Sequence, residues 1–374
     1  MQIEKPIEPD HPVLRVPTHE EAAAILAEHG AGKLAELMSL RNAAIRAERE
    51  NPLEYGFELP TWLLADVLLG FIGYDVFKMR IQKLIAMAWA EDIAVSLQEW
   101  LEDERLERAI RNGPYQLGLL LGGNSAAKTE YMIKRMVEHA VKFDESEIWA
   151  FHQAETPSID YHQTRTWKFL PPHWKNAGMK GRPAYVAYKT ATGFPKGGLI
   201  GPNSSKIKHK NYAQDEDDAI EGGEVGDVLT RRCVGWVADE LLPESWLRTL
   251  EKRLNRRQAV GIVGFTPKWG YTETVARFLD GAQMVREEWG DVLATPKMIP
   301  LVRVNDNKVI INFHTRYNPY PNRGSYPNLV QMVQGDNDNE RAIRVYGHTE
   351  AERITLFGKL NSAAHSFESV IFNR

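Results

Sequence analysis

Residues 117–129 read LGLLLGGNSAAKT, and this stretch decides the fold. Its apolar start predicts a short buried strand, its small residues predict a turn, and Lys128 and Thr129 open a helix that should end near Val141. Small residues let a backbone turn wrap an anion so that several N–H groups point inward, and a helix N-terminus adds partial positive charge. The stretch therefore predicts a phosphate-binding loop.

The loop residues have separate expected roles. Lys128 should reach the β- and γ-phosphates of a nucleotide, and the Thr129 hydroxyl should be a ligand of Mg²⁺. ATP and Mg²⁺ are therefore the expected ligands. The backbone of the turn should surround the phosphates, which assigns cofactor-binding positions to Gly122, Gly123, Asn124, Ser125, Ala126 and Ala127.

The match to the pattern G-x-x-x-x-G-K-[ST] is imperfect at one position. Ala127 stands where a second glycine is usual. Alanine tolerates a positive φ poorly, so the turn should close with altered geometry or with strain. The alternative to a phosphate-binding loop is an ordinary strand-to-helix connection with a surface lysine.

Composition limits the classes of protein to consider. The chain has 374 residues, of which 43% are hydrophobic and 26% charged, as in ordinary soluble globular proteins. Its net charge of −4 gives no global signal for a polyanion partner, so any DNA contact must use local basic patches. The single cysteine, Cys233, excludes an intrachain disulfide framework. The start has no apolar signal-peptide region and charges interrupt the apolar stretch 63–95, so neither secretion nor a membrane span is expected.

The chain divides into three regions by pattern. Residues 1–112 should form a helical N-terminal region, residues 113–350 an α/β core and residues 351–374 a C-terminal tail. Short apolar runs alternate with helices in the core, which predicts a mainly parallel sheet with helices on both faces and a hairpin within 192–224. The expected strands are 116–121, 147–151, 184–188, 234–238, 259–265 and 309–314, and the expected helices are 128–142, 157–169, 244–255 and 271–281.

Another strand of the core ends in two acids. The stretch 233–240, CVGWVADE, indicates a buried strand followed by Asp239 and Glu240. Asp239 can hold Mg²⁺, commonly through water, and Glu240 can polarise the attacking water as a general base. Ligands of open α/β sheets collect at the C-terminal ends of strands, where the phosphate loop also opens. The alternative is a strand followed by an exposed acidic turn.

The two motifs together predict an α/β P-loop NTPase of the additional-strand catalytic-glutamate (ASCE) type, which hydrolyses ATP. The next strand, 259–265, ends in Thr266 and Pro267. A polar residue at that tip can sense the γ-phosphate and pass its state to the following loop. The alternative for Thr266 is a turn threonine before proline.

A series of motifs follows a fixed order along residues 51–350. They are NPLEYGFELPTW (51–62), GGNSAAKTE (122–130), PSIDYHQTRTWKFLPPHW (157–174), YAQDEDDAIEGGEVGD (212–227), VADELLPESWLRTLEKRL (237–254), GFTPKWGYTETVARFLDGA (264–282), FHTRYNPYPN (313–322) and IRVYGHTE (343–350). This ordered set resembles the large terminase subunit of tailed bacteriophages, the motor that packages DNA into the capsid.

The resemblance implies an ATPase domain that moves double-stranded DNA into a procapsid. It implies a portal protein and a small terminase subunit as partners, and a ring of identical subunits, with a pentamer expected. Such a ring would work in the host cytoplasm, transiently at the portal vertex. The resemblance also places 51–62 on the adenine side, where Tyr55 and Trp62 could stack on the base. Core packing is the alternative for both aromatic residues.

Three features depart from the family pattern. The spacing between Trp62 and Gly122 suggests a helical insertion at 63–112. Ser125 stands where the family often has a basic residue, so a different arginine is expected to neutralise transition-state charge. The family's nuclease domain does not follow: it lies on another polypeptide, as a separate nuclease subunit, or the chain is truncated, or packaging uses another cutter.

Two groups of basic residues are further candidates. Arg253 and Arg257 lie on the expected helix 244–255 or just beyond it, and either could contact DNA phosphates or act as an arginine finger on a neighbouring subunit. Lys206, Lys208 and Lys210 alternate along an expected hairpin and could contact a DNA backbone. The alternatives are a solvated helix face and an ordinary exposed hairpin.

Two rival functions stay open at this point. A different P-loop machine, such as a helicase, would separate nucleic-acid strands. A non-catalytic scaffold would bind nucleotide without turnover, which Ser125 and Ala127 make conceivable.

Overall fold

The structure is a computed structural model of the whole chain. The residues it describes are 19–87, 91–123, 125–175, 186–212, 220, 223–240, 242–267, 272–290, 297–319, 330–331 and 333–348. Asn124 of the phosphate loop lies outside these ranges. No helix in the described part of the chain is long and apolar enough to cross a membrane.

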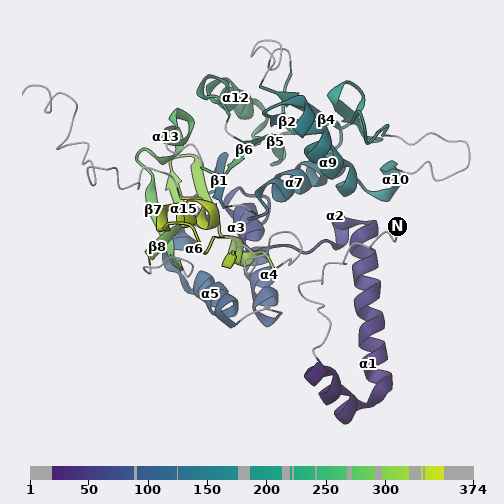
Figure 1. The fold of residues 1–374 in the computed structure, drawn as a ribbon. Helices are drawn as coiled ribbons and strands as arrows, with labels where there is room; N and C mark the ends of the chain where they lie inside the picture. The colour runs from purple at the N-terminus through teal and green to yellow at the C-terminus, as the bar shows by residue number, and fades with distance from the viewer. Residues whose placement is uncertain are drawn as a thin grey trace, which may run out of the picture.

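The N-terminal part is helical, as expected. Its longest element, α1, has a kink at Gly30, where φ is 79°. Figure 1 shows α1 extending away from the rest of the protein. The remaining helices pack in the main body. The six elements are α1 (His19–Glu50), α2 (Pro52–Tyr55), α3 (Pro60–Leu68), α4 (Tyr74–Ala86), α5 (Glu91–Glu102) and α6 (Glu104–Asn112).

The core is built on one sheet of nine strands within the described residues. Its strand order is β3-β4-β2-β5-β6-β1-β9-β8-β7, and the pairs from β4 to β9 are all parallel. The strands are β1 (Leu117–Gly122), β2 (Glu147–His152), β3 (Gly198–Ile200), β4 (Lys206–Asn211), β5 (Val234–Asp239), β6 (Val260–Phe265), β7 (Gln283–Gly290), β8 (Lys297–Asn305) and β9 (Lys308–Phe313).

Strand β6 lies between β1, which leads to the phosphate loop, and β5, which ends in the two acids. An extra strand at this position defines the ASCE arrangement. The predicted fold, an α/β P-loop NTPase of ASCE type with a mainly parallel sheet and an N-terminal helical region, is therefore confirmed.

Helices cover both faces of the sheet because side chains alternate along each strand. On one face, Leu120 and Ile262 join a core with α3 to α7. On the other face, Leu119 and Val263 pack with α12 and α13. Figure 1 shows α12 and α13 on the side of the sheet away from α3. The bounds are α7 (Lys128–Lys142), α12 (Glu244–Arg257) and α13 (Glu273–Leu279).

The shorter elements surround this frame. Helical structure fills the expected range 157–169, although part of it is a π-helix, η1. The shorter elements are α8 (Glu155–Pro157), η1 (Ser158–Gln163), α9 (Thr164–Phe169), α10 (Pro172–Lys175), η2 (Pro195–Gly197), η3 (Thr315–Tyr317), α15 (Asp338–Arg341) and η5 (Ala342–Tyr346).

The structure differs from the sequence-based expectations in two places. The described part of the expected strand 184–188 forms no strand; next to it, Lys189 and Gly193 make only an isolated bridge. Strands β7 and β8 were not expected. The polar sequence of β7 hides its pattern, because Arg286 and Glu288 are buried with ionic partners rather than exposed.

Candidate functional site

The turn between β1 and α7 is the predicted loop, and its small residues are required by close packing. A Cβ on Gly123 would lie 1.9 Å from the backbone oxygen of Arg344, and one on Gly122 would lie 2.8 Å from that of Phe313. Ala127 adopts the left-handed region with φ 62°, which confirms the expected strain. Its carbonyl accepts from the N–H of Tyr131, so α7 begins at once and directs its N-terminus toward the turn.

The Lys128 ammonium group lies inside this turn. It donates to the carbonyls of Gly122 (2.8 Å) and Gly123 (3.0 Å). It also donates to Thr266 Oγ1 at 3.2 Å, across 138 positions of the sequence. The structure therefore brings the predicted phosphate-binding lysine and the predicted sensor together at the ends of β1 and β6.

Thr129 contacts the first acid of the second motif. Its hydroxyl donates to Oδ1 and Oδ2 of Asp239, each at 3.0 Å. Burial raises the pKa of the Asp239 carboxyl to about 6, against the opposing effects of this hydrogen bond and of the Lys128 and Arg165 charges. A hydroxyl beside a carboxylate is a pair of oxygen donors of the kind that Mg²⁺ prefers.

Glu240 follows directly at the same strand end. Its backbone adopts φ 67°, its N–H donates to the carbonyl of Gly264 at 2.9 Å, and its side chain is exposed. This hydrogen bond ties the end of β5 to the end of β6, two residues before Thr266. Glu240 is not among the described residues that line the cavity beside the loop.

That cavity has a volume of about 690 Å³, within the range of small-molecule sites. The loop forms one wall, with Lys128, Thr129 and Thr266. The apolar part of the lining comes from the N-terminal helices and α9: Ile45, Pro52, Phe57, Leu59, Trp62 and Phe169. A polar phosphate end and an apolar end thus occur in one cavity.

The two residues predicted to contact adenine, Trp62 and Tyr55, line different cavities. Trp62 lines the cavity, is buried, and donates from Nε1 to the carbonyl of Ala127 at 3.2 Å, so it also supports the loop. Tyr55 is 54% exposed and lines a different cavity, on the other side of α2, with Arg80 and Arg135. The structure therefore does not bring Tyr55 to the site, and its expected adenine contact needs correction.

Arg253 and Arg257 lie far from this cavity, near the N-terminal ends of the strands. Helix α12 runs back along the sheet, so its last turn sits next to the start of β6. Arg253 donates to the carbonyl of Gly223 at 2.6 Å, and Arg257 forms an ion pair with Glu224 at 2.8 Å. Neither can reach a nucleotide bound by its own chain.

Lys206, Lys208 and Lys210 share one face of β4, and β3 and β4 form the expected hairpin. Their environments differ. Lys206 is exposed, whereas Lys208 pairs with Glu147 at 2.6 Å. Lys210 lies 4.8 Å over the Trp149 ring, and burial together with the Lys208 charge lowers its pKa. Only Lys206 is an exposed cation as predicted.

Several site residues were missed. Arg165 lines the cavity from α9, and Asn318 donates to the carbonyl of Ser125 at 2.8 Å. His162 Nε2 lies 3.2 Å from Asp239 Oδ2, and its ring stacks on His152, with centroids 4.0 Å apart. The motifs 157–174 and 313–322 were noted as wholes, but no spacing rule identified these residues.

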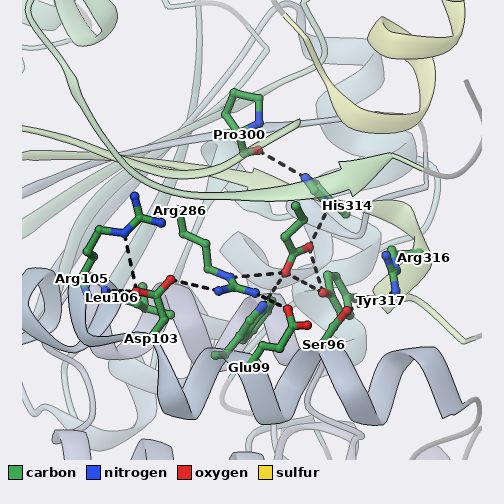
Figure 2. Close-up of polar contacts among 12 residues, drawn as sticks. Ser96, Glu99, Asp103, Arg105, Leu106, Arg286, Pro300, His314, Arg316 and Tyr317 are labelled. Carbon is green, nitrogen blue, oxygen red and sulfur yellow. Dashed lines mark hydrogen bonds and ion pairs between the residues drawn. The ribbon is translucent and has the colours of Figure 1, made fainter. Parts of the chain in front are cut away.

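Asn318 directly follows Tyr317, which belongs to a buried polar cluster around Glu288 (Figure 2). Tyr317 donates to Glu288 at 2.9 Å, Trp100 also donates to it, and His314 Nδ1 lies 3.3 Å away. Burial alone would raise the pKa of Glu288, but these three partners lower it below its usual value. Figure 2 shows Arg286 reaching Asp103, which fastens the β7–β8 hairpin to α5 and α6.

Comparisons with known proteins give a distant likeness in fold. No family model matches the chain, and no curated protein does so. Two solved structures are similar: the large terminase ATPase domain of Thermus phage P74-26, at 15% identity and a TM-score of 0.42, and an arginine mutant of that domain, at 13% and 0.41. Each alignment covers 65% of this chain and 92% of the other.

Proposed function

We propose that this chain is an ATP-hydrolysing motor subunit that translocates double-stranded viral DNA into a procapsid, as the ATPase domain of a large terminase subunit. One observation carries the ATPase part of the proposal. Thr129 lines the same cavity as Lys128 and donates a hydrogen bond to Asp239, 110 positions away in the sequence. The motif series along 51–350 supports the packaging role.

The residues present fit a magnesium nucleotide. The turn offers backbone N–H groups and the N-terminus of α7 to phosphates, and Lys128 supplies a positive charge. Thr129 and Asp239 would hold Mg²⁺, and when bound this ion neutralises phosphate charge. The apolar part of the lining, including Trp62, would receive the base.

In the proposed reaction, Glu240 takes a proton from water while the water oxygen forms a bond to the γ-phosphorus. The bond from that phosphorus to the bridging oxygen breaks, and its electron pair stays on ADP. The products are ADP and inorganic phosphate. The Glu240 side chain, at the exposed end of β5, can then release the proton to solvent.

Thr266 would couple hydrolysis to movement. Its hydroxyl shares the Lys128 ammonium group with the loop carbonyls. A γ-phosphate would compete for that ammonium group, so its arrival or departure changes the contact made by Thr266. The segment after Pro267 would carry this change to loops that grip DNA.

The proposal includes partners and a place of action. A portal protein and a small terminase subunit would complete the machine, and identical subunits would form a ring, expected to be a pentamer. The ring would act in the host cytoplasm, transiently at the portal vertex.

The test measures phosphate release with and without duplex DNA for wild type, Glu240→Gln and the control Glu102→Gln. Loss of the general base should lower turnover by about 10²- to 10⁴-fold, while the control should match wild type. Equal release by wild type and Glu240→Gln would favour a nucleotide-binding scaffold. Strand separation in an unwinding assay would favour a helicase, because packaging leaves the duplex intact.

A further inference from the structure

The phosphate loop carries little positive charge for a reaction that moves a phosphoryl group. Among its described residues, Lys128 is the single cation, and its ammonium group also contacts two loop carbonyls. At position 125 there is a serine, whose carbonyl accepts a hydrogen bond from Asn318. Charge spreads over three equatorial oxygens in phosphoryl transfer, and related enzymes commonly add an arginine to stabilise it.

Arg165 lies where such an arginine is needed. It comes from α9 and lines the cavity together with Lys128 and Thr129. Its Nε donates to Glu130, the residue that follows Thr129. Its guanidinium lies 3.4 Å over the Tyr161 ring, which fixes the plane of the group. The side chain is thus held at the phosphate end of the cavity by two contacts.

The contacts that hold Arg165 leave the two terminal nitrogens of its guanidinium available to a phosphate. Glu130 engages Nε, and neither terminal nitrogen has a hydrogen-bond or ion-pair partner among the residues that the structure describes. Two parallel N–H groups suit the two oxygens of a phosphoryl group. Arg165 also lines the same cavity as Thr129, the expected magnesium ligand, and contacts the residue next to it.

We propose that Arg165 contacts the γ-phosphate of ATP bound by the same chain and stabilises the charge of the transition state. It supplies the positive charge that Ser125 does not. Glu130 is a positioning residue, since it holds Arg165 through Nε. This inference rests on the proposed ATPase function.

Arg253 and Arg257 cannot take this role within one chain. Both are fixed at the N-terminal ends of the strands by Gly223 and Glu224. Contact with ATP from either would require a second copy of the chain. Arg165 needs no second copy, so its effect should be present in the isolated chain.

The test uses the full chain and three variants: Arg165→Gln, Arg165→Lys and Glu130→Gln. Binding of ADP and of ADP with aluminium fluoride, which mimics the transferring phosphoryl group, is measured by calorimetry. Arg165→Gln should bind ADP within about threefold of wild type, but lose about 10²-fold in affinity for the aluminium fluoride complex. Its turnover should fall by about 10²- to 10³-fold.

The other variants separate contact from packing. Arg165→Lys keeps a positive charge near Glu130 but lacks the two parallel N–H groups of a guanidinium. It should therefore restore less than a tenth of the affinity for the aluminium fluoride complex that Arg165→Gln loses, as expected for a bidentate site. Glu130→Gln keeps the guanidinium and should stay within about fivefold of wild type, because a neutral partner still accepts from Nε. Arg111→Gln, at an exposed arginine of α6 that pairs with Glu107, is the matched control and should equal wild type.

The outcomes distinguish this inference from the proposed function. If wild type hydrolyses ATP, Glu240→Gln does not, and Arg165→Gln behaves as wild type, the role of Arg165 is refuted and the ATPase stands. If Arg165→Gln and Arg165→Lys lose ADP binding and thermal stability as strongly as they lose affinity for the aluminium fluoride complex, the arginine is structural and the inference fails. If wild type shows no turnover, both proposals fall together.

Discussion

The two ends of the parallel strands differ in what their polar residues contact. At the C-terminal ends, Lys128, Thr129 and Asp239 form hydrogen bonds across more than a hundred positions and leave a cavity beside them. At the N-terminal ends, Arg257 and Arg253 are bound to nearby acids and carbonyls of one short segment. Convergence of predicted residues therefore indicates a site, whereas charge density alone does not.

The largest effect should come from removing the cation at the C-terminal end. Lys128→Ala deletes the ammonium group that would bind the β- and γ-phosphates, so ATP turnover should fall by about 10²- to 10³-fold, or about 3 to 4 kcal/mol in the barrier. Steady-state phosphate release measures it. Arg257→Ala, at the other end, should leave turnover of the isolated chain unchanged. Equal losses in the two variants would remove the distinction between the ends.

Packing against the loop gives the second test. Gly123→Ala would place a methyl group 1.9 Å from the Arg344 carbonyl, which must move away. We expect a loss of about 1–3 kcal/mol in the free energy of unfolding, as for other overpacked positions, and weaker ADP binding. Gly32→Ala, with nothing within 4 Å of the added Cβ, is the control and should not be destabilised. Urea unfolding reports both; an unaffected Gly123→Ala would mean that the close approach is absent.

A histidine near the N-terminal ends of the strands should make the folding stability depend on pH. Burial lowers the pKa of His139 to about 3, and its Nδ1 accepts from the N–H of Val234 at the start of β5. The unfolded chain binds this proton below about pH 6.5 and the folded chain does not, so stability is complete above pH 6.5 and is lost as pH falls toward 3. Between pH 6.5 and 5 this histidine should cost about 2 kcal/mol.

The variant His139→Asn keeps an acceptor near Val234 but does not titrate. Its free energy of unfolding should therefore fall less steeply with acid than that of wild type, whatever its value at pH 7. Urea midpoints at half-unit pH steps provide the comparison. The buried His162, His152 and His209 also have lowered pKa values, so some acid dependence must persist in the variant. Parallel curves for the two proteins would contradict the assignment to His139.

The sequence predicted the elements whose residues are uniformly apolar or follow one period. β1, β5 and β6 are buried along almost their whole length, and α7 has the expected bounds, because burial on both sides of a parallel strand leaves a continuous apolar run. β7 was missed because Arg286 and Glu288 occupy buried positions where apolar residues are expected.

The same limit applies to the candidate site, where only residues in local motifs were predictable. Lys128, Thr129 and Asp239 belong to patterns in which adjacent residues define the chemistry. Asn318 meets Ser125 across 193 positions, and Arg165 meets Glu130 across 35, so each contact depends on the packing of separate elements. No local pattern encodes such a pair, because the partner is fixed only when the sheet has formed.

The smallest expected effect is on duplex DNA binding by the lysines of β4. Lys206→Gln removes an exposed charge, which should weaken duplex binding a few-fold and reduce the slope of log affinity against log salt by about 0.9. Lys208→Gln and Lys210→Gln should change less, because Glu147 and Trp149 already engage these side chains. Fluorescence anisotropy at several salt concentrations measures all three, with Lys78→Gln on α4 as the control. If Lys206→Gln binds DNA with the same slope as that control, β4 does not contact the duplex, and its lysines are ordinary surface charges like the arginines of α12.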